Sequence, residues 1–127
     1  MLRAADLILA EDKRVTAKLL AHIGAKARMQ AYHDHSSEED RSAIVARLGH
    51  EAVALVSDAG TPLISDPGYK LVRAAREAGL AVHTLPGPSA VIAALTLAGL
   101  PTDRFLFCGF LPPKAKARTD AIVEFLT

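Results

Sequence analysis

The sequence predicts an α/β domain with a mainly parallel sheet that is flanked by helices. Short apolar runs of strand length alternate with stretches of helical periodicity along the 127 residues. The connections between them are short, which is typical of βαβ units. Half of the residues are hydrophobic, which suffices for a compact core. We therefore expect one domain over residues 1–127.

Five segments are expected to form strands. Each is a short run of apolar or β-prone residues bounded by polar or turn-forming residues. They cover residues 7–10, 28–32, 52–56, 80–85 and 104–110. The run over residues 52–56 is continuously apolar, as expected of a strand that is buried on both faces.

Five further segments have the spacing of amphipathic helices. They are expected over residues 15–23, from about residue 36, and over residues 69–78, 89–98 and 114–126. Serines can cap the second helix, and the acidic residues after them suit the positive end of its dipole. The residues of the first helix that are expected to face the core are Val15, Leu19, Leu20 and Ile23.

Composition restricts the possible partners and setting of the protein. The 15 basic residues nearly balance the 14 acidic residues, so no overall positive field indicates a nucleic-acid partner, and only a local basic patch is left open. Cys108 is the single cysteine, which excludes an intrachain disulfide and favours a reducing, cytoplasmic setting. No apolar run approaches the roughly 20 residues that a membrane span requires. We expect neither a membrane nor a DNA partner.

Three polar or glycine-rich connections follow predicted strands. They are Glu11-Asp12-Lys13-Arg14, the loop over residues 57–68, and Pro86-Gly87-Pro88-Ser89-Ala90. Ligands of open α/β sheets bind at the carboxyl ends of the strands. Glycine lets the backbone approach a ligand closely, and serine and threonine hydroxyls donate and accept hydrogen bonds. The pattern matches neither a dinucleotide-binding fingerprint nor a P-loop.

Each of these features also has an interpretation without a ligand. Asp58 and Asp66 form good turns with their neighbouring glycines, so a turn is as credible as a site for that loop alone. Three such loops at one edge favour the ligand. Glu11, Asp12 and Arg14 form either a carboxylate–guanidinium set or the polar first turn of a helix, and composition slightly favours the latter.

His33-Asp34-His35 raises the question of a metal site. On a strand the two imidazoles would share one face, while Asp34 would point to the other. A closed site normally needs three or four ligands, and the sequence offers no further paired ligand. We therefore expect no metal.

Taken together, these motifs resemble the tetrapyrrole methylase superfamily. The resemblance is closest to its branch of small-subunit ribosomal RNA methyltransferases, which methylate a cytidine 2′-oxygen. It covers the whole chain in order, and its S-D-A-G-T-P-x-I-S-D-P-G element is highly specific. The motifs are A-E-D-K-R, H-D-H, L-V-S-D-A-G-T-P-L-I-S-D-P-G-Y, L-P-G-P-S-A and A-G-L-P-T-D-R-F-L-F-C-G-F-L-P.

The resemblance implies a methyltransferase that uses S-adenosylmethionine and acts on 16S RNA of the small ribosomal subunit. Members are two-domain homodimers that bind the cofactor between their domains. The family's first strand and its C-terminal domain have no counterpart here, and Lys13 stands where the family usually has threonine. We therefore expect a truncated N-terminal methylase domain that binds the cofactor weakly by itself.

The resemblance also implies roles for individual residues. Glu11, Asp12 and Asp66 are unranked candidates for the catalytic base, and Arg14 is a candidate for phosphate or carboxylate pairing. The alternatives are a small-molecule tetrapyrrole methylase and a non-catalytic nucleotide- or RNA-binding module. The expected cofactor-binding residues are Asp58, Ala59, Gly60, Thr61, Pro62, Ile64, Gly87, Ser89 and Ala90.

Overall fold

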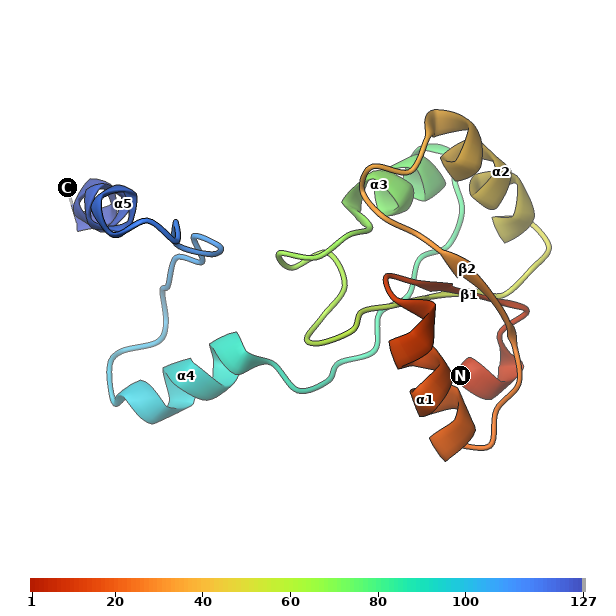
Figure 1. The fold of residues 1–127 in the computed structure, drawn as a ribbon, viewed down its shortest axis with the longest axis horizontal. Helices are drawn as coiled ribbons and strands as arrows, with labels where there is room; N and C mark the ends of the chain where they lie inside the picture. Colours follow the sequence, from red (N-terminus) through yellow and green to blue (C-terminus); the bar gives the residue numbers. More distant parts are fainter. Residues whose placement is uncertain (127) are drawn as a thin grey trace. The chain divides into compact units, whose positions relative to one another are not determined.

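Three short parallel strands form the sheet in the computed structural model, which describes residues 1–126 (Figure 1). The strands are β1 (Leu7–Ala10), β2 (Arg28–Ala31) and β3 (Val53–Val56), in the order β2-β1-β3. The last residue of β1 is level with the last residue of each neighbour. All three carboxyl ends therefore lie at one edge. The predicted α/β class with parallel pairing is confirmed.

Helices connect and follow these strands. α1 links β1 to β2, α2 links β2 to β3, and α3 follows β3 after the loop over residues 57–68. The predicted helices, and the first three predicted strands, are confirmed to within about two residues at each end. The helices are η1 (Leu2–Ala4), α1 (Lys13–His22), α2 (Glu38–Leu48), α3 (Tyr69–Glu77), α4 (Ala90–Ala98) and α5 (Ala115–Leu126).

The core lies on both faces of β1, whose four residues are at most 1% exposed. Leu7 and Leu9 pack on one face with Ile44 of α2 and Leu71 of α3. On the other face, Ile8 shares a cluster with Leu20 of α1. The alternation of side chains along a strand produces this division. The sheet is thus the middle of three layers, with α2 and α3 on one side and α1 on the other (Figure 1).

Local capping explains where the first two helices begin. The side chain of Asp12 accepts a hydrogen bond from the Arg14 amide at the start of α1, at 2.8 Å. Ser37 Oγ accepts one from the Asp40 amide at the start of α2, at 3.0 Å. Each bond satisfies a backbone donor that the helix itself leaves unpaired. The capping role predicted for the serines of α2 is confirmed for Ser37, whereas the Ser36 hydroxyl accepts from the His33 amide instead.

Two of the predicted strands are wrong. Residues 80–85 and 104–110 join no sheet in the part of the chain that the structure describes. Most of their large apolar side chains are exposed: Leu85 is 64% exposed and Leu106 is 76% exposed. A run of apolar and β-branched residues favours an extended backbone, but a strand also needs a neighbouring strand to pair with its backbone hydrogen-bonding groups. Neither segment has such a neighbour among residues 1–126.

Two burial predictions also need correction. Val15 and Leu19 are each 41% exposed, whereas Thr16 and Leu20 form the buried side of α1. Those two buried positions are four residues apart, so they share one helix face. β3 is half-buried because it is one of the two outer strands, so the expectation of burial on both faces is wrong for it. The central strand β1 has that environment instead.

Backbone contacts divide the chain into two units, Met1–Val91 and Ile92–Thr127. The first unit contains the sheet and α1 to α3. In the second, α5 has no buried residue. One domain over residues 1–127 stays a prediction. No helix within residues 1–126 is both long enough and apolar enough to cross a bilayer.

Adjacent leucines of α1 provide a test of this packing. We expect Leu20→Ala to lower the free energy of unfolding by about 2–4 kcal/mol, because Leu20 is 5% exposed within the core. Leu19→Ala makes the same chemical change at an exposed position of the same helix, so it should cost less than about 1 kcal/mol. Urea unfolding followed by circular dichroism measures both. Equal losses would contradict the orientation of α1.

Candidate functional site at the carboxyl edge of the sheet

Polar side chains gather where the three strands end. Glu11 and Asp12 directly follow β1, His33 follows β2 by two residues, and Asp58 follows β3 by two residues. Because the strand ends are level, these residues reach the same edge. They belong to a shallow, open depression of about 580 Å³, whose lining residues are Glu11, Asp12, Lys13, Arg14, Ala31, His33 and Asp58.

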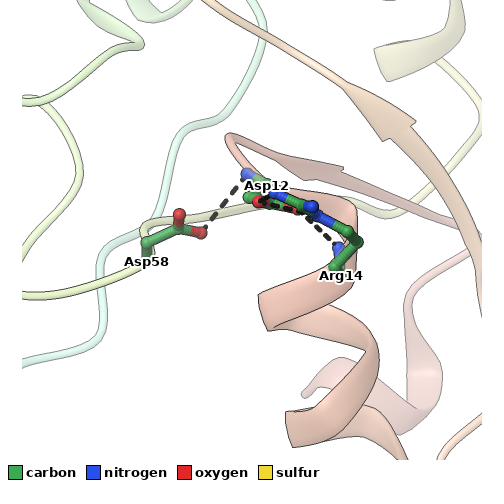
Figure 2. A network of polar contacts seen from close by, with 3 residues as sticks. All are labelled: Asp12, Arg14 and Asp58. Carbon is green, nitrogen blue, oxygen red and sulfur yellow. Dashed lines mark hydrogen bonds and ion pairs between the residues drawn. The ribbon is translucent and has the colours of Figure 1, made fainter.

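Asp12 and Arg14 form a two-pronged ion pair at this edge (Figure 2). Arg14 Nη2 donates to Asp12 Oδ2 at 2.7 Å, and Arg14 Nε is 3.1 Å from each carboxylate oxygen. The Arg14 side chain is nevertheless 89% exposed. The pair therefore orients the guanidinium in a planar, charge-assisted geometry while leaving most of it open to solvent.

This contact changes the acidity of both groups. Hydrogen bonds from Arg14 lower the pKa of Asp12 to about 2, and Asp12 raises the pKa of Arg14. A carboxylate with such a low pKa is a weak proton acceptor near neutral pH. Asp12 is thus suited to capping α1 and holding Arg14, and poorly suited to acting as a base.

Asp58 ties the loop after β3 to the connection after β1. Its Oδ1 accepts a hydrogen bond from the Asp12 amide at 3.3 Å, across 46 residues of sequence (Figure 2). The carboxylate of Asp58 therefore already has a structural partner. This contact joins two of the three connections that the sequence analysis expected at one edge.

The loop between Asp58 and α3 opens into a turn of small residues. Ala59 and Gly60 are exposed, and Gly60 has a φ of +81°, which favours glycine. A Cβ atom built on Gly60 would meet nothing within 4 Å. The Ser57 hydroxyl hydrogen-bonds the backbone of Ala59, and the Ile64 amide donates to the backbone carbonyl of Thr61 at 3.2 Å. A ligand can therefore approach the backbone of this turn closely.

The other predicted site residues lie outside the depression. Pro62 and Asp66 are half-buried in the loop, and Ile64 is 54% exposed. Asp66 does not cap α3, whose N-cap is Gly68. The predicted site segment over residues 86–90 contains Gly87 in irregular backbone, while Ser89 and Ala90 lie where α4 begins.

The structure brings together Glu11, Asp12, Arg14 and Asp58 of the predicted site. The turn over residues 59–61 follows Asp58 directly, so it lies beside the depression without lining it. Neither Asp66 nor the segment over residues 86–90 contributes to that depression. The roles predicted for all of these residues stay predictions.

Sequence reasoning gave too little weight to His33 and Asp34. Residues 33–35 follow β2 in irregular and turn backbone, outside the strand predicted over residues 28–32, so the geometry that they would have on a strand does not apply. His33 lines the depression, and Asp34 Oδ1 accepts a hydrogen bond from the Gly68 amide at 3.0 Å. The sequence signal that could have placed these residues at the site is the position of the polar tripeptide just after a predicted strand. Within residues 1–126, no group of three or more potential ligands could hold a metal ion.

A smaller depression of about 270 Å³ lies near the amino ends of the strands, and its lining residues are Asp6, Arg28, His50 and Glu51. Its polar groups serve the local structure. Asp6 Oδ2 accepts a hydrogen bond from the Ala52 amide at 2.8 Å. Glu51 pairs with Arg47 and lies 4.0 Å from Arg28.

Comparison with known proteins assigns this architecture to a family. The model of the tetrapyrrole (corrin/porphyrin) methylases matches residues 1–126. The chain belongs to the tetrapyrrole methylase family. The superfamily resemblance that its motifs predicted is thereby confirmed.

Similar members of the tetrapyrrole methylase family carry one name, ribosomal RNA small subunit methyltransferase I. The protein of that name from Escherichia coli O157:H7 is 56% identical over 123 residues, which are 96% of this chain and 43% of the relative. The protein from Xylella fastidiosa is 54% identical, over 98% of this chain and 46% of the relative. The protein from Rickettsia prowazekii is 48% identical, over 98% of this chain and 45% of the relative. The chain thus spans less than half the length of these relatives.

The pKa of Asp12 provides a test of the ion pair at this edge. We expect NMR titration to give a value of about 2, and Arg14→Ala to return it toward 3.8. The pKa is depressed in the folded state, so ionised Asp12 contributes stability above about pH 3.8 that is lost as the pH falls through about 2.

Lys13→Ala is the matched control, because it removes a neighbouring cation that makes no hydrogen bond to Asp12 among the contacts described here. The pKa of Asp12 should stay nearly unchanged in that variant. An equal shift in both variants would show that general charge, not the Arg14 contact, sets its acidity.

Proposed function

We propose that the protein to which this chain belongs transfers a methyl group from S-adenosylmethionine to the 2′-oxygen of a cytidine in 16S ribosomal RNA. The observation that carries the proposal is the open Ala59-Gly60-Thr61 turn beside a depression lined by Glu11 and Arg14. Family membership and the shared name of the relatives support methyl transfer to RNA of the small ribosomal subunit. The cytidine 2′-oxygen as acceptor rests on the resemblance of the motifs.

The residues of the turn fit the cofactor. The exposed Ala59 and Gly60 present backbone groups with no side chain in the way, and Thr61 supplies a hydroxyl. We propose that Asp58, Pro62 and Ile64 flank this contact, and that Gly87, Ser89 and Ala90 complete the cofactor-binding set. When bound, S-adenosylmethionine supplies a methyl group on a sulfonium, ready for in-line displacement.

Glu11 is the favoured base among the three candidates. A ribose hydroxyl is a poor nucleophile, and a carboxylate that accepts its proton as the new bond forms lowers the barrier. The low pKa of Asp12 and its engagement with Arg14 make it the weaker choice. Asp66 lies outside the depression that Glu11 lines. We propose that Glu11 accepts the proton of the 2′-hydroxyl.

Arg14 is suited to hold the RNA backbone. Its guanidinium is oriented by Asp12 and remains 89% exposed, so it can pair with a phosphate without losing its first partner. This contact would position the acceptor nucleotide beside Glu11. Positioning supplies much of the acceleration in a displacement of this kind.

The remaining proposals concern the whole gene product. We propose that it acts as a cytoplasmic homodimer on the small ribosomal subunit, and that it binds the cofactor between two domains. This chain alone should bind S-adenosylmethionine weakly, since it spans less than half the length of its relatives. Submicromolar binding by residues 1–127 alone would contradict that expectation.

Methyl transfer provides the direct test of the reaction. We expect the whole gene product to move labelled methyl groups from S-adenosylmethionine to 16S RNA in the small ribosomal subunit, at a cytidine 2′-oxygen. Labelling of a tetrapyrrole instead would indicate a small-molecule methylase. If the protein neither binds S-adenosylmethionine nor transfers a methyl group, both enzyme hypotheses are excluded and the hypothesis of a non-catalytic nucleotide- or RNA-binding module is favoured.

Gly60 tests the cofactor turn. We expect Gly60→Ala to raise the Kd for S-adenosylmethionine about tenfold or more, because the added methyl group occupies space that the cofactor would use. Gly79→Ala is the matched control: Gly79 has a similar φ of +72°, and its Cβ would also meet nothing within 4 Å. Calorimetry measures both variants. Equal losses of affinity would indicate backbone strain alone and contradict this placement.

Glu11 tests the proposed base. We expect Glu11→Gln to lower kcat about 10²-fold with little change in cofactor Kd, because the amide cannot accept the proton. Glu38→Gln, in the first turn of α2, makes the same substitution outside the depression and should leave kcat unchanged. A normal kcat in Glu11→Gln would exclude Glu11 as the base.

A further inference from the structure

The loop between β3 and α3 contains an unusual number of left-handed backbone conformations. φ is positive at Gly60, Leu63, Ser65 and Gly68, with values of +81°, +74°, +53° and +131°. Leu63 and Ser65 have side chains that disfavour this region. Such a backbone persists only where contacts from outside the segment hold it in place.

Asp34 supplies such a contact at the end of the loop. Its Oδ1 accepts a hydrogen bond from the Gly68 amide at 3.0 Å, although 34 residues separate the two in sequence. Lys70 Nζ donates to the backbone carbonyl of Asp34 at 3.2 Å, so α3 also holds the turn that carries Asp34. Both bonds are partly buried and involve a charged group, which makes them stronger than exposed neutral ones.

Close packing makes the end of the loop rigid. Gly68 is buried, and a Cβ atom there would lie 2.5 Å from Leu55 Cδ2 and 3.1 Å from Leu63 Cδ1. The Gly68 amide therefore has little freedom to move away from Asp34. At the other end of the loop, Asp58 is bonded to the Asp12 amide. The turn over residues 59–61, in which Ala59 and Gly60 are exposed and Thr61 is half-buried, lies between these two attachments.

We infer that Asp34 is a positioning residue, whose bond to the Gly68 amide fixes the geometry of the Ala59-Gly60-Thr61 turn for cofactor binding. This inference rests on the proposed function of that turn. Asp34 acts through the backbone of the loop and does not touch the reacting atoms. The inference gives a role to Asp34, the middle residue of His33-Asp34-His35, which has no part in the proposed reaction.

Three variants of the whole gene product test this role. Asp34→Ala removes the acceptor, whereas Asp34→Asn keeps an amide oxygen that can accept from the Gly68 amide. Leu20→Ala destabilises the core but leaves the bond to Gly68 intact. Hydrogen exchange of the Gly68 amide reports on the attachment without any ligand. The KM for S-adenosylmethionine and kcat report on the turn.

In Asp34→Ala we expect exchange at Gly68 to accelerate about tenfold or more, and the KM for S-adenosylmethionine to rise about tenfold with kcat changed less than about threefold. Asp34→Asn should stay within about threefold of the wild type in both measurements. Leu20→Ala should leave the KM near the wild-type value, because it does not release the loop.

Three results would overturn the inference: unchanged exchange in Asp34→Ala, faster exchange with an unchanged KM, or an equal rise of KM in Leu20→Ala. The first two would leave the proposed function intact, since the wild type would still bind the cofactor. A wild-type protein that does not bind S-adenosylmethionine would instead refute the proposed function, and the inference with it.

Discussion

The burial of β1 between two parallel neighbours is the constraint on which the rest of the structure depends. Its four residues are at most 1% exposed. Because side chains alternate between the two faces of a strand, those on one face pack against α2 and α3 and those on the other face pack against α1. The same strand sets the register, because its last residue is level with the ends of β2 and β3. The polar residues that follow the three strands therefore share one edge.

Hydrogen bonds between distant connections then organise that edge. Asp58 joins the loop after β3 to the start of α1, and Asp34 joins the end of that loop to the turn after β2. Asp12 meanwhile caps α1 and orients Arg14. Asp12, Asp34 and Asp58 each accept a hydrogen bond from a backbone amide, whereas Asp66 lies outside the depression. Glu11 is left as the favoured proton acceptor.

Local patterns in the sequence predicted much of the fold, including β1, the helices and the cap of α2. They failed where the outcome depends on a distant partner. Residues 80–85 and 104–110 have strand-like composition but no neighbouring strand within residues 1–126. Leu19 fits a helical apolar stripe, yet α1 turns Leu20 toward β1 instead. Long-range contacts of this kind leave no periodic signal.

The candidate site follows the same rule. For the loop motif alone, the sequence left a structural turn and a ligand-binding turn equally credible, and only the three connections together favoured a ligand. That binding role stays a prediction. The role of Asp34 could not be predicted, because its partner lies 34 residues away and is a backbone amide. The weakness of Asp12 as a base likewise follows only from its geometry with Arg14.

The most direct test of the account is an NMR titration of the isotopically labelled whole gene product with S-adenosylmethionine. The account predicts that the backbone amide signals of Ala59, Gly60 and Thr61 shift most in this part of the chain. Shifts confined to the depression at the opposite end of the sheet, around Asp6 and His50, would contradict it.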